Sequence, residues 1–375
     1  MRVLLLADPF SAHVIKWANG LNSKGVEVLV FGLSDYDQAQ FDPGVRIEIF
    51  KIPQFVKWQA DGNWMKSSYL FSIIKLKRVI KKFGCDILHA HSASSYGLLG
   101  SLADFHPYVI SVWGNDVYNF PQKSKLFSYL IKYNFNKCDR IFSTSKIMAN
   151  ETSKYTGKEI TVTPFGIDIQ KFKPCLSESL FNENDIVIGT IKSLEKKYGS
   201  EDLLKAFISL KNTYPELPLK LLMVGRGSLE NHLKKIVKDN YLEDSVIITG
   251  FVPFDQIPRY HNMLDIYVAP STEESETFGV AILEASACEK PVIVSDVGGL
   301  PEVVVANQTG FFVEPNNPGM LASKIEILIL DFELRKKLGV AGRKFVCEKY
   351  NWNDNLKQVI SVYNELIENK TKSIK

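Results

Sequence analysis

The sequence predicts an α/β fold made of two doubly wound domains, each with a parallel sheet between layers of helices. Its length of 375 residues exceeds what one hydrophobic core usually supports. Apolar strand-like runs alternate with segments of helical periodicity, and a complete β-α-β unit lies within residues 1–31. The alternation restarts at Ile186, after a polar stretch with proline at 172–184, where we place the domain junction.

The first half opens with an apolar run, Arg2–Ala7, which ends at Asp8-Pro9 and predicts a buried parallel strand. The next segment, His13–Lys24, has apolar residues at helical spacing and stops at Gly25, a common helix terminator. Further strands are predicted at 26–31, 45–52, 86–88, 108–112, 140–143 and 160–164, and further helices at 67–83, 92–100 and 146–156.

The second half repeats the same pattern of apolar strands and amphipathic helices. Strands are predicted at 186–191, 219–224, 246–249, 264–268, 291–294 and 310–313. Helices are predicted at 201–214, 229–239, 255–263, 280–288, 320–330, 333–348 and 353–369.

Composition places the chain among soluble globular proteins, with 45% hydrophobic and 23% charged residues. The net charge of +3 is too small to indicate a nucleic-acid partner. The five cysteines are scattered, which favours a reducing compartment and argues against structural zinc. The apolar runs are too short for a signal peptide or a membrane span, so we expect a cytoplasmic protein.

A basic amphipathic segment, 67–83, allows two interpretations. Its five cations are Lys75, Lys77, Arg78, Lys81 and Lys82. They could contact anionic lipid and hold the protein peripherally on the inner face of the cell membrane. They could instead form the solvated face of a helix that covers the sheet, which we favour because the sheet needs such a cover.

Acidic residues after the second strand raise the question of a metal site. Asp35 and Asp37 have a spacing that could hold a divalent cation against a diphosphate. No third ligand lies nearby in the sequence, so we favour a solvated loop over 34–42 and predict no metal.

Polar side chains also follow two other strands of the first half. His89 and His91 follow the predicted strand 86–88, and Asp116 follows the strand 108–112. Because parallel strands end at one edge of a sheet, we expect these three residues to lie close together. One of the two histidines is expected to be structural.

The stretch 268–302 of the second half has the pattern of a ligand site. Glu276 ends a polar loop, Phe278-Gly279 follows, and Glu284 lies one turn into the next predicted helix. Free N–H groups of Gly279, Val280 and Ala281 at that helix start favour an anion such as a diphosphate. The two carboxylates could bind hydroxyl groups of the same ligand. The alternative is an exposed helix start whose glutamates favour the helix dipole.

Two more strand ends of the second half suit phosphate binding. Lys192 and Lys197 flank the loop after strand 186–191, and Lys196 is an equal candidate beside Lys197. The turn Gly225-Arg226-Gly227 permits close backbone approach after strand 219–224. Two lysines near a helix start would neutralise a diphosphate without a metal.

These motifs resemble a known family over nearly the whole chain. The run from Glu276 to Glu284 matches the E-x7-E motif of retaining GT-B glycosyltransferases of family 4, also called glycosyl transferases group 1. The segments 164–168 and 225–227 resemble that family's P-x-G-[VI]-D and G-x-G turns. The resemblance implies a GT-B fold of two Rossmann-like domains facing across a cleft. The domains would span 1–173 and 174–352, with a helix at 353–375 crossing back to the first domain.

The resemblance also implies a role for each matching residue. Glu276 would hold donor-sugar hydroxyls and Glu284 the ribose, while Lys192 and Lys197 would balance the leaving diphosphate. The other residues implied in donor binding are Phe278, Gly279, Val280, Ala281, Gly225, Arg226, Gly227, Phe251 and Val252. Such enzymes need no cofactor or metal, and the nucleotide-sugar is a substrate.

The chain departs from the family pattern on the acceptor side. Trp113 occupies the place where many members carry a histidine, and Lys192 stands where arginine is usual. We therefore expect the acceptor to be faced by a different set of residues, namely His13, His89, His91 and Asp116.

The implied activity is transfer of a sugar, with retention of configuration, from a nucleotide-sugar to a glycan or lipid-linked acceptor. A bacterial surface polysaccharide such as lipopolysaccharide is the expected product, with no nucleic-acid partner. Alternatives on the same architecture are a nucleotide-sugar epimerase, a phosphorylase, or a nucleotide-sugar-binding protein without catalysis.

Overall fold

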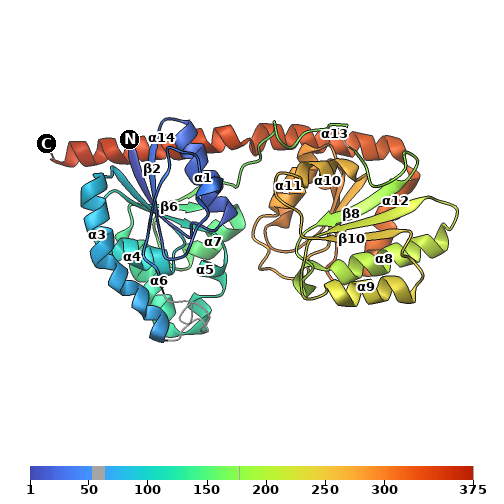
Figure 1. Ribbon diagram of the computed structural model, residues 1–375, viewed down its shortest axis with the longest axis horizontal. Helices are drawn as coiled ribbons and strands as arrows, with labels where there is room; N and C mark the ends of the chain where they lie inside the picture. Colours follow the sequence, from blue (N-terminus) through green and yellow to red (C-terminus); the bar gives the residue numbers. More distant parts are fainter. Residues whose placement is uncertain (53–63, 177, 375) are drawn as a thin grey trace. The chain divides into compact units, whose positions relative to one another are not determined.

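The computed structural model describes residues 1–52, 64–176 and 178–374. The chain divides into two compact units, each with its own sheet (Figure 1). The first unit combines Met1–Thr163 with Leu356–Lys375, and the second unit is the continuous segment Pro164–Asn355. The C-terminal segment of the chain thus belongs to the same unit as its N-terminal half.

The first unit contains a seven-stranded parallel sheet of order β3-β2-β1-β4-β5-β6-β7. The strand order reverses between β1 and β4, and folds of this class bind ligands at such a switch point. The strands are β1 (Arg2–Leu6), β2 (Glu27–Gly32), β3 (Arg46–Ile49), β4 (Ile87–His91), β5 (Tyr108–Val112), β6 (Arg140–Ser143) and β7 (Ile160–Val162).

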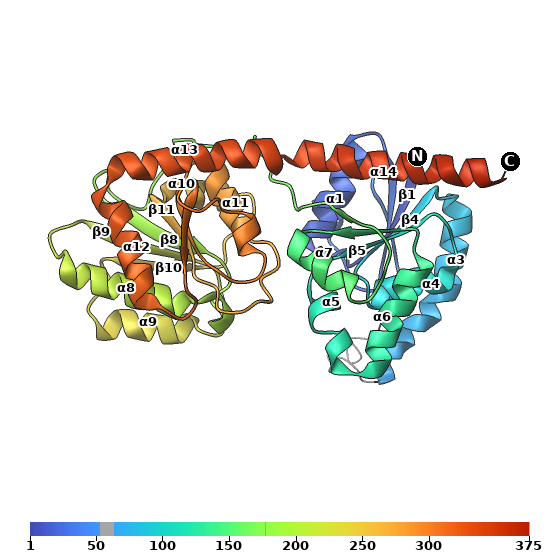
Figure 2. The same ribbon diagram turned by 180° about the vertical axis from the view of Figure 1, so that it is seen from behind.

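Helices cover both faces of this sheet, which explains why β4 and β5 are buried at every position. On one face α4 lies against β4 between α3 and α6 (Figure 2). The helical elements are α1 (Ala12–Ser23), η1 (Gln38–Gln40), η2 (Trp64–Phe71), α3 (Ser72–Phe83), α4 (Ser95–Ala103), α5 (Asn115–Tyr118), η3 (Pro121–Lys123), α6 (Lys125–Lys137), α7 (Lys146–Ser153) and α14 (Trp352–Ile374).

Prediction and structure of the first unit differ mainly at three elements. The short strand 86–88 was wrong at its end, because β4 continues through His91 and directs both histidines to one face. The predicted helix 67–83 is a 3₁₀ segment, η2, followed by α3, which ends at Gly84 in the left-handed conformation. Helix α6 was not predicted, and it begins at Ser124, whose side chain accepts the Phe127 N–H.

The second unit contains a six-stranded parallel sheet of order β10-β9-β8-β11-β12-β13. The strand order reverses between β8 and β11, which places the loops after these two strands side by side. The strands are β8 (Ile186–Ile191), β9 (Leu219–Val224), β10 (Val246–Gly250), β11 (Ile266–Ala269), β12 (Val292–Ser295) and β13 (Gly310–Val313).

Long apolar side chains from these strands and from α8 and α12 form one core, which includes Phe207, Leu221, Ile266 and Ile325. The predicted strands match the observed ones to within two residues at most ends. The helical elements of this unit are η4 (Lys196–Tyr198), α8 (Ser200–Thr213), α9 (Glu230–Asp239), α10 (Ile257–Met263), α11 (Val280–Ala287), η5 (Leu300–Glu302), α12 (Pro318–Leu330) and α13 (Phe332–Lys349).

Candidate active site

Helix α11 of the second unit begins at the carboxyl edge of the sheet, after the loop that follows β11. Gly279 is its N-cap, and Ile282 and Leu283 donate the first helical hydrogen bonds to the Gly279 carbonyl. Phe278 is 3% exposed and packs edge-on against Phe165, with ring centroids 5.9 Å apart. The buried ring fixes the helix start, so the N–H groups of the first turn have a fixed direction for an anion.

The loops after β8 and β11 meet through an ion pair. The Nζ atom of Lys192 lies 3.1 Å from Oε1 and 2.9 Å from Oε2 of Glu276. Both side chains are partly buried, so the charges are shielded less than at an open surface. The structure thus brings together two residues that the sequence placed 84 positions apart.

A tyrosine lies beside this pair. The Lys192 ammonium lies 4.4 Å from the centroid of the Tyr198 ring, and the Lys197 ammonium lies 4.9 Å from the same centroid. Both distances suit a cation–π contact. Sequence reasoning missed Tyr198, although it adjoins Lys197 in the chain.

Two adjoining cavities open at this point of the second unit. The first, of about 10 Å³, has the polar lining residues Thr190, Lys192, Tyr198, Tyr267, Ser271 and Glu276, with Gly279 and Ala281 at the helix start. The second, of about 160 Å³, is lined by Lys197, Tyr198, Glu273, Ser275, Glu276 and Thr277. Lys197 lines this cavity and Lys196 does not, which separates the two lysines that the sequence left equal.

The loop that carries these lysines is held at both ends. Thr272 donates its backbone N–H to the Lys197 carbonyl at 2.8 Å, which joins the loop to the segment after β11. On the other side, the Glu195 carboxylate accepts the Ser228 N–H at 2.8 Å and also the Ser228 hydroxyl. The pKa of Glu195 is lowered by these hydrogen bonds.

Glu284 lies on the buried side of α11, with the residue 7% exposed. Its Oε2 atom lies 3.5 Å from Nε2 of His261, which is fully buried. Neither ring nitrogen of His261 has a hydrogen-bond partner among the described residues. Burial raises the pKa of the neighbouring Tyr267, and the Glu284 charge adds to that shift.

The turn after β9 faces the predicted base-binding residues. Gly225 donates its N–H to the Gly250 carbonyl at 3.0 Å, and Leu194 donates to the Arg226 carbonyl at 2.9 Å. The Arg226 guanidinium lies 5.9 Å from the ring centroid of Phe251, which is 66% exposed. Gly227 lies against the Leu194 backbone, and Val252, next to Phe251, is half-buried.

In the first unit, His89 is held inside the fold. Its Nδ1 atom lies 2.6 Å from the Tyr363 hydroxyl and its Nε2 atom 2.7 Å from the Ser111 hydroxyl. Burial lowers the pKa of His89, which is therefore neutral at pH 7. Both ring nitrogens are occupied by the fold, so His89 is the structural member of the histidine pair.

His91 lies next to His89 on β4, with ring centroids 4.4 Å apart. Its Nδ1 atom has no partner among the described residues, and burial lowers the pKa to about 3, with a smaller effect from His13. Trp113 lies 4.8 Å from His91 and 5.9 Å from His13, measured between ring centroids. Four residues discussed for the acceptor side, His13, His89, His91 and Trp113, thus form one aromatic cluster at the switch point.

Asp116 is 6% exposed, and its carboxylate binds backbone N–H groups of two loops. Its carboxylate accepts the N–H groups of Ala93 at 2.7 Å, Gly114 at 2.9 Å and Trp113 at 3.2 Å. Burial raises the pKa of Asp116, and these hydrogen bonds oppose that shift. Asp116 therefore joins the loops that follow β4 and β5.

The remaining sequence features lie apart from these clusters. Asp35 pairs with Lys51 at 2.9 Å, and the Asp37 side chain caps η1. Within residues 1–52, 64–176 and 178–374, no three His, Cys, Asp or Glu side chains come together in a way that could hold a metal. Among the described helices, none combines the length and apolarity needed to cross a membrane.

Comparison with known proteins decides the family. The model of the family "Glycosyl transferases group 1" matches residues 176–345, and that of "Glycosyl transferase 4-like" matches residues 2–145. The capsular polysaccharide biosynthesis glycosyltransferase CapM of Staphylococcus aureus is 33% identical over 266 residues, which cover 65% of this chain and 67% of CapM. The chain belongs to the group 1 glycosyl transferases.

Other similar proteins cover this glycosyltransferase more fully. An uncharacterized glycosyltransferase of Methanocaldococcus jannaschii is 28% identical over 348 residues, 92% of each chain. Among solved structures, sucrose-phosphate synthase from Thermosynechococcus elongatus has a TM-score of 0.81 at 19% identity, covering 98% of this chain and 99% of that one. HepE of Anabaena, in complex with UDP, has a TM-score of 0.79 at 18% identity and covers 98% and 100%. The predicted GT-B fold and glycosyltransferase class are confirmed.

Proposed function

We propose that this glycosyltransferase moves a sugar from a nucleotide-sugar, with retention of configuration, to a glycan or lipid-linked acceptor in bacterial surface polysaccharide synthesis. The observation that carries the proposal is the convergence of Lys192, Lys197 and Glu276 on two cavities next to the start of α11. Support also comes from the UDP and UDP-glucose complexes of HepE and from the capsular role in the name of CapM.

The reaction breaks the bond between the anomeric carbon and the diphosphate oxygen and forms a bond to the acceptor oxygen. The acceptor proton leaves with the departing phosphate, so the atoms balance. Lys192, Lys197 and the N–H groups at α11 would stabilise the negative charge that develops on the diphosphate. Glu276 would orient the sugar by accepting hydrogen bonds from its hydroxyls.

The remaining donor contacts follow from the same placement. Glu284 would bind the ribose, Phe251 would border the base beside Arg226, and His91 with Trp113 would face the acceptor. The proposed site needs neither a metal nor another cofactor, because two ammonium groups and a helix start supply the positive charge.

The first experiment measures nucleotide-sugar binding and turnover. We would screen UDP-, GDP- and CMP-sugars by thermal stabilisation, because a ligand of the folded state raises its apparent stability. The Glu276→Gln and Lys197→Ala variants are then compared with the wild type for transfer or donor hydrolysis. We expect losses of about 100-fold or more, as for other groups that stabilise charge in a transition state.

The Lys235→Ala variant is the matched control, because this lysine lies on α9, outside both cavities. Near-normal turnover in both site variants would contradict the assignment. Binding without turnover of any donor would favour the non-catalytic alternative. The anomeric configuration of the product, read by NMR, tests retention.

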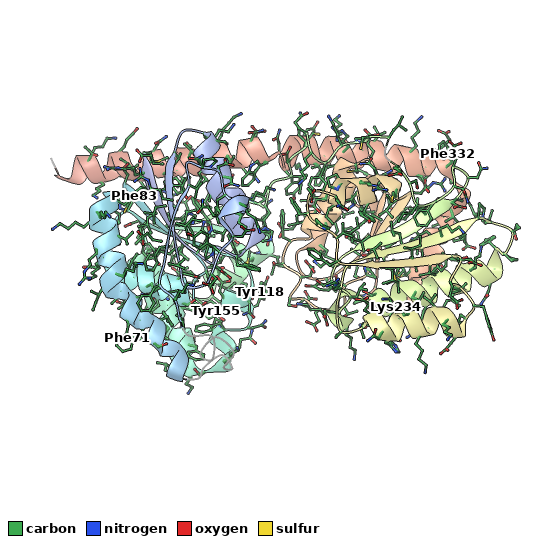
Figure 3. All side chains as sticks on the ribbon, in the orientation of Figure 1. Phe71, Phe83, Tyr118, Tyr155, Lys234 and Phe332 are labelled. Carbon is green, nitrogen blue, oxygen red and sulfur yellow. The ribbon has the colours of Figure 1, made fainter. Side chains whose placement is uncertain are left out.

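We further propose that the first unit contacts an anionic membrane through η2 and α3. Phe71 and Ile74 are 74% and 59% exposed, and Figure 3 shows Phe71 on the outer side of this unit. Exposed cations follow on α3, namely Lys77, Arg78, Lys81 and Lys82. Apolar side chains beside cations suit a surface of anionic lipid.

Vesicle sedimentation tests this contact. The triple change Lys77→Glu, Arg78→Glu and Lys81→Glu should abolish sedimentation with phosphatidylglycerol vesicles. The control carries the same charge change on α9 of the second unit, at positions Lys234, Lys235 and Lys238 (Figure 3 marks Lys234). Equal loss in both triple variants would refute a contact specific to α3.

A further inference from the structure

We infer that Tyr198 is a positioning residue, whose ring holds Lys192 and Lys197 at the spacing that a diphosphate requires. The inference rests on the proposed function, because it assigns the two ammonium groups to the leaving group of the donor. The Tyr198 ring is in cation–π contact with both lysines and lines both cavities.

The inference begins from the repulsion between two ammonium groups that line adjoining cavities. Glu276 compensates Lys192 directly, with its carboxylate 2.9 Å from the ammonium. The Tyr198 ring has a negative face, and it attracts both cations, at 4.4 and 4.9 Å from its centroid. A ring that attracts both ammonium groups favours a conformation in which they stay near each other.

The backbone around Tyr198 is fixed, so the ring is a rigid support. Tyr198 donates its N–H to the Glu195 carbonyl at 3.0 Å, and the neighbouring Lys197 carbonyl accepts the Thr272 N–H at 2.8 Å. The next residue, Gly199, lies so close to Pro270 that an added Cβ would be 1.9 Å from the Pro270 carbonyl oxygen. The segment after β11 therefore holds this part of the loop after β8 in place.

A rigid ring matters because lysine side chains are flexible. Each lysine loses rotamer freedom when its ammonium is fixed, and that loss weakens ligand binding unless the side chain is already ordered. Contact with Tyr198 orders both side chains before the donor arrives. A bound diphosphate then replaces Glu276 in part of its contact with Lys192, so the Glu276 carboxylate becomes available to bind the sugar.

Two substitutions distinguish the role of the Tyr198 ring from that of its hydroxyl group. The Tyr198→Phe variant retains the aromatic face, and the Tyr198→Leu variant removes it while keeping an apolar side chain. We would measure affinity for UDP, GDP and inorganic pyrophosphate by calorimetry, together with donor hydrolysis. We expect Tyr198→Phe to stay within about twofold of the wild type and Tyr198→Leu to lose about tenfold in affinity and in kcat, from the size of a cation–π contact.

A double-mutant cycle distinguishes positioning from a merely structural role. In a Lys197→Ala background, the effect of Tyr198→Leu should shrink from about tenfold to about threefold, because only the contact with Lys192 remains. The melting temperature of the ligand-free Tyr198→Leu protein should match that of the wild type. An undiminished effect in the Lys197→Ala background, or a Tyr198→Phe variant as impaired as Tyr198→Leu, would overturn the inference.

The pyrophosphate measurement keeps this inference apart from the proposed function. A wild type that binds pyrophosphate but no nucleotide-sugar contradicts the proposed donor, while the response of pyrophosphate affinity to Tyr198→Leu still decides the role of the ring. A wild type that binds neither ligand overturns both. Nucleotide binding that Tyr198→Leu leaves unchanged overturns only the positioning role.

Discussion

Replacing Gly199 by alanine should destabilise the second unit more than a backbone conformation alone explains. Gly199 has a φ of +66°, and an added Cβ would lie 1.9 Å from the Pro270 carbonyl oxygen, where ordinary contact begins at 3.4 Å. The left-handed conformation costs about 1–2 kcal/mol for a residue with a Cβ. Relief of the contact requires the chain to move, which breaks the Thr272 hydrogen bond to Lys197 and costs about 1 kcal/mol more.

The expected loss for Gly199→Ala is therefore about 2–3 kcal/mol of unfolding free energy. Two glycines of the same unit serve as controls. Gly250 has a φ of +74° and only ordinary contacts, the nearest at 3.6 Å, so Gly250→Ala should lose about 1–2 kcal/mol. Gly319 lies in the first turn of α12 with its nearest contact at 3.7 Å, so Gly319→Ala should lose nothing or gain up to about 1 kcal/mol.

Hydrogen exchange of β8 and β9 in the full-length protein reports the stability of this unit without requiring it to unfold together with the other. The same variants are assayed for donor hydrolysis, because a shift of Gly199 carries Lys197 and Tyr198 with it. The reasoning fails if Gly199→Ala is no more destabilising than Gly250→Ala, or if it is destabilised but retains full activity.

Two predictions concern the first unit. His91 has a pKa of about 3 in the folded state and is neutral there, whereas the unfolded chain takes up a proton at this residue near pH 6.5. The free energy of unfolding should therefore fall as the pH drops from 6.5 towards 3. In urea titrations at different pH values, His91→Gln should reduce the slope of this free energy against pH by about 1.4 kcal/mol per pH unit. Tyr363→Phe should lower the free energy of unfolding, measured with urea, by about 1–3 kcal/mol, because Nδ1 of the buried His89 loses its hydrogen-bond partner. Tyr241→Phe is the control, because this residue is 91% exposed and the substitution should cost nothing measurable.

Most of the sheet architecture could be predicted because parallel strands are buried on both faces and appear as short apolar runs. The strand β4 was predicted too short, because histidines are polar and their burial depends on partners elsewhere. His89 is satisfied by Tyr363, which is 274 residues away in the sequence. Helix α6 was not predicted, although Ser124 and the apolar spacing after it are visible in the sequence.

The candidate site shows a similar limit. Glu276, Lys192 and Lys197 could be proposed from motifs, since a diphosphate site needs cations near a helix start. Their mutual geometry depends on which strands are neighbours, and β8 lies next to β11 only in the folded sheet. For that reason neither the ion pair nor the role of Tyr198 could be predicted, and only the structure separates Lys197 from Lys196.

The return of α14 to the first unit has a consequence for biosynthesis. The second unit is a continuous segment, 164–355, and the ribosome completes it before residues 356–375 appear. In the first unit, by contrast, the strands are synthesised long before α14, the helix that supplies Tyr363 to His89. During translation, His89 therefore lacks its Tyr363 partner until the entire second unit has been synthesised, and the incomplete first unit is prone to aggregation in that interval.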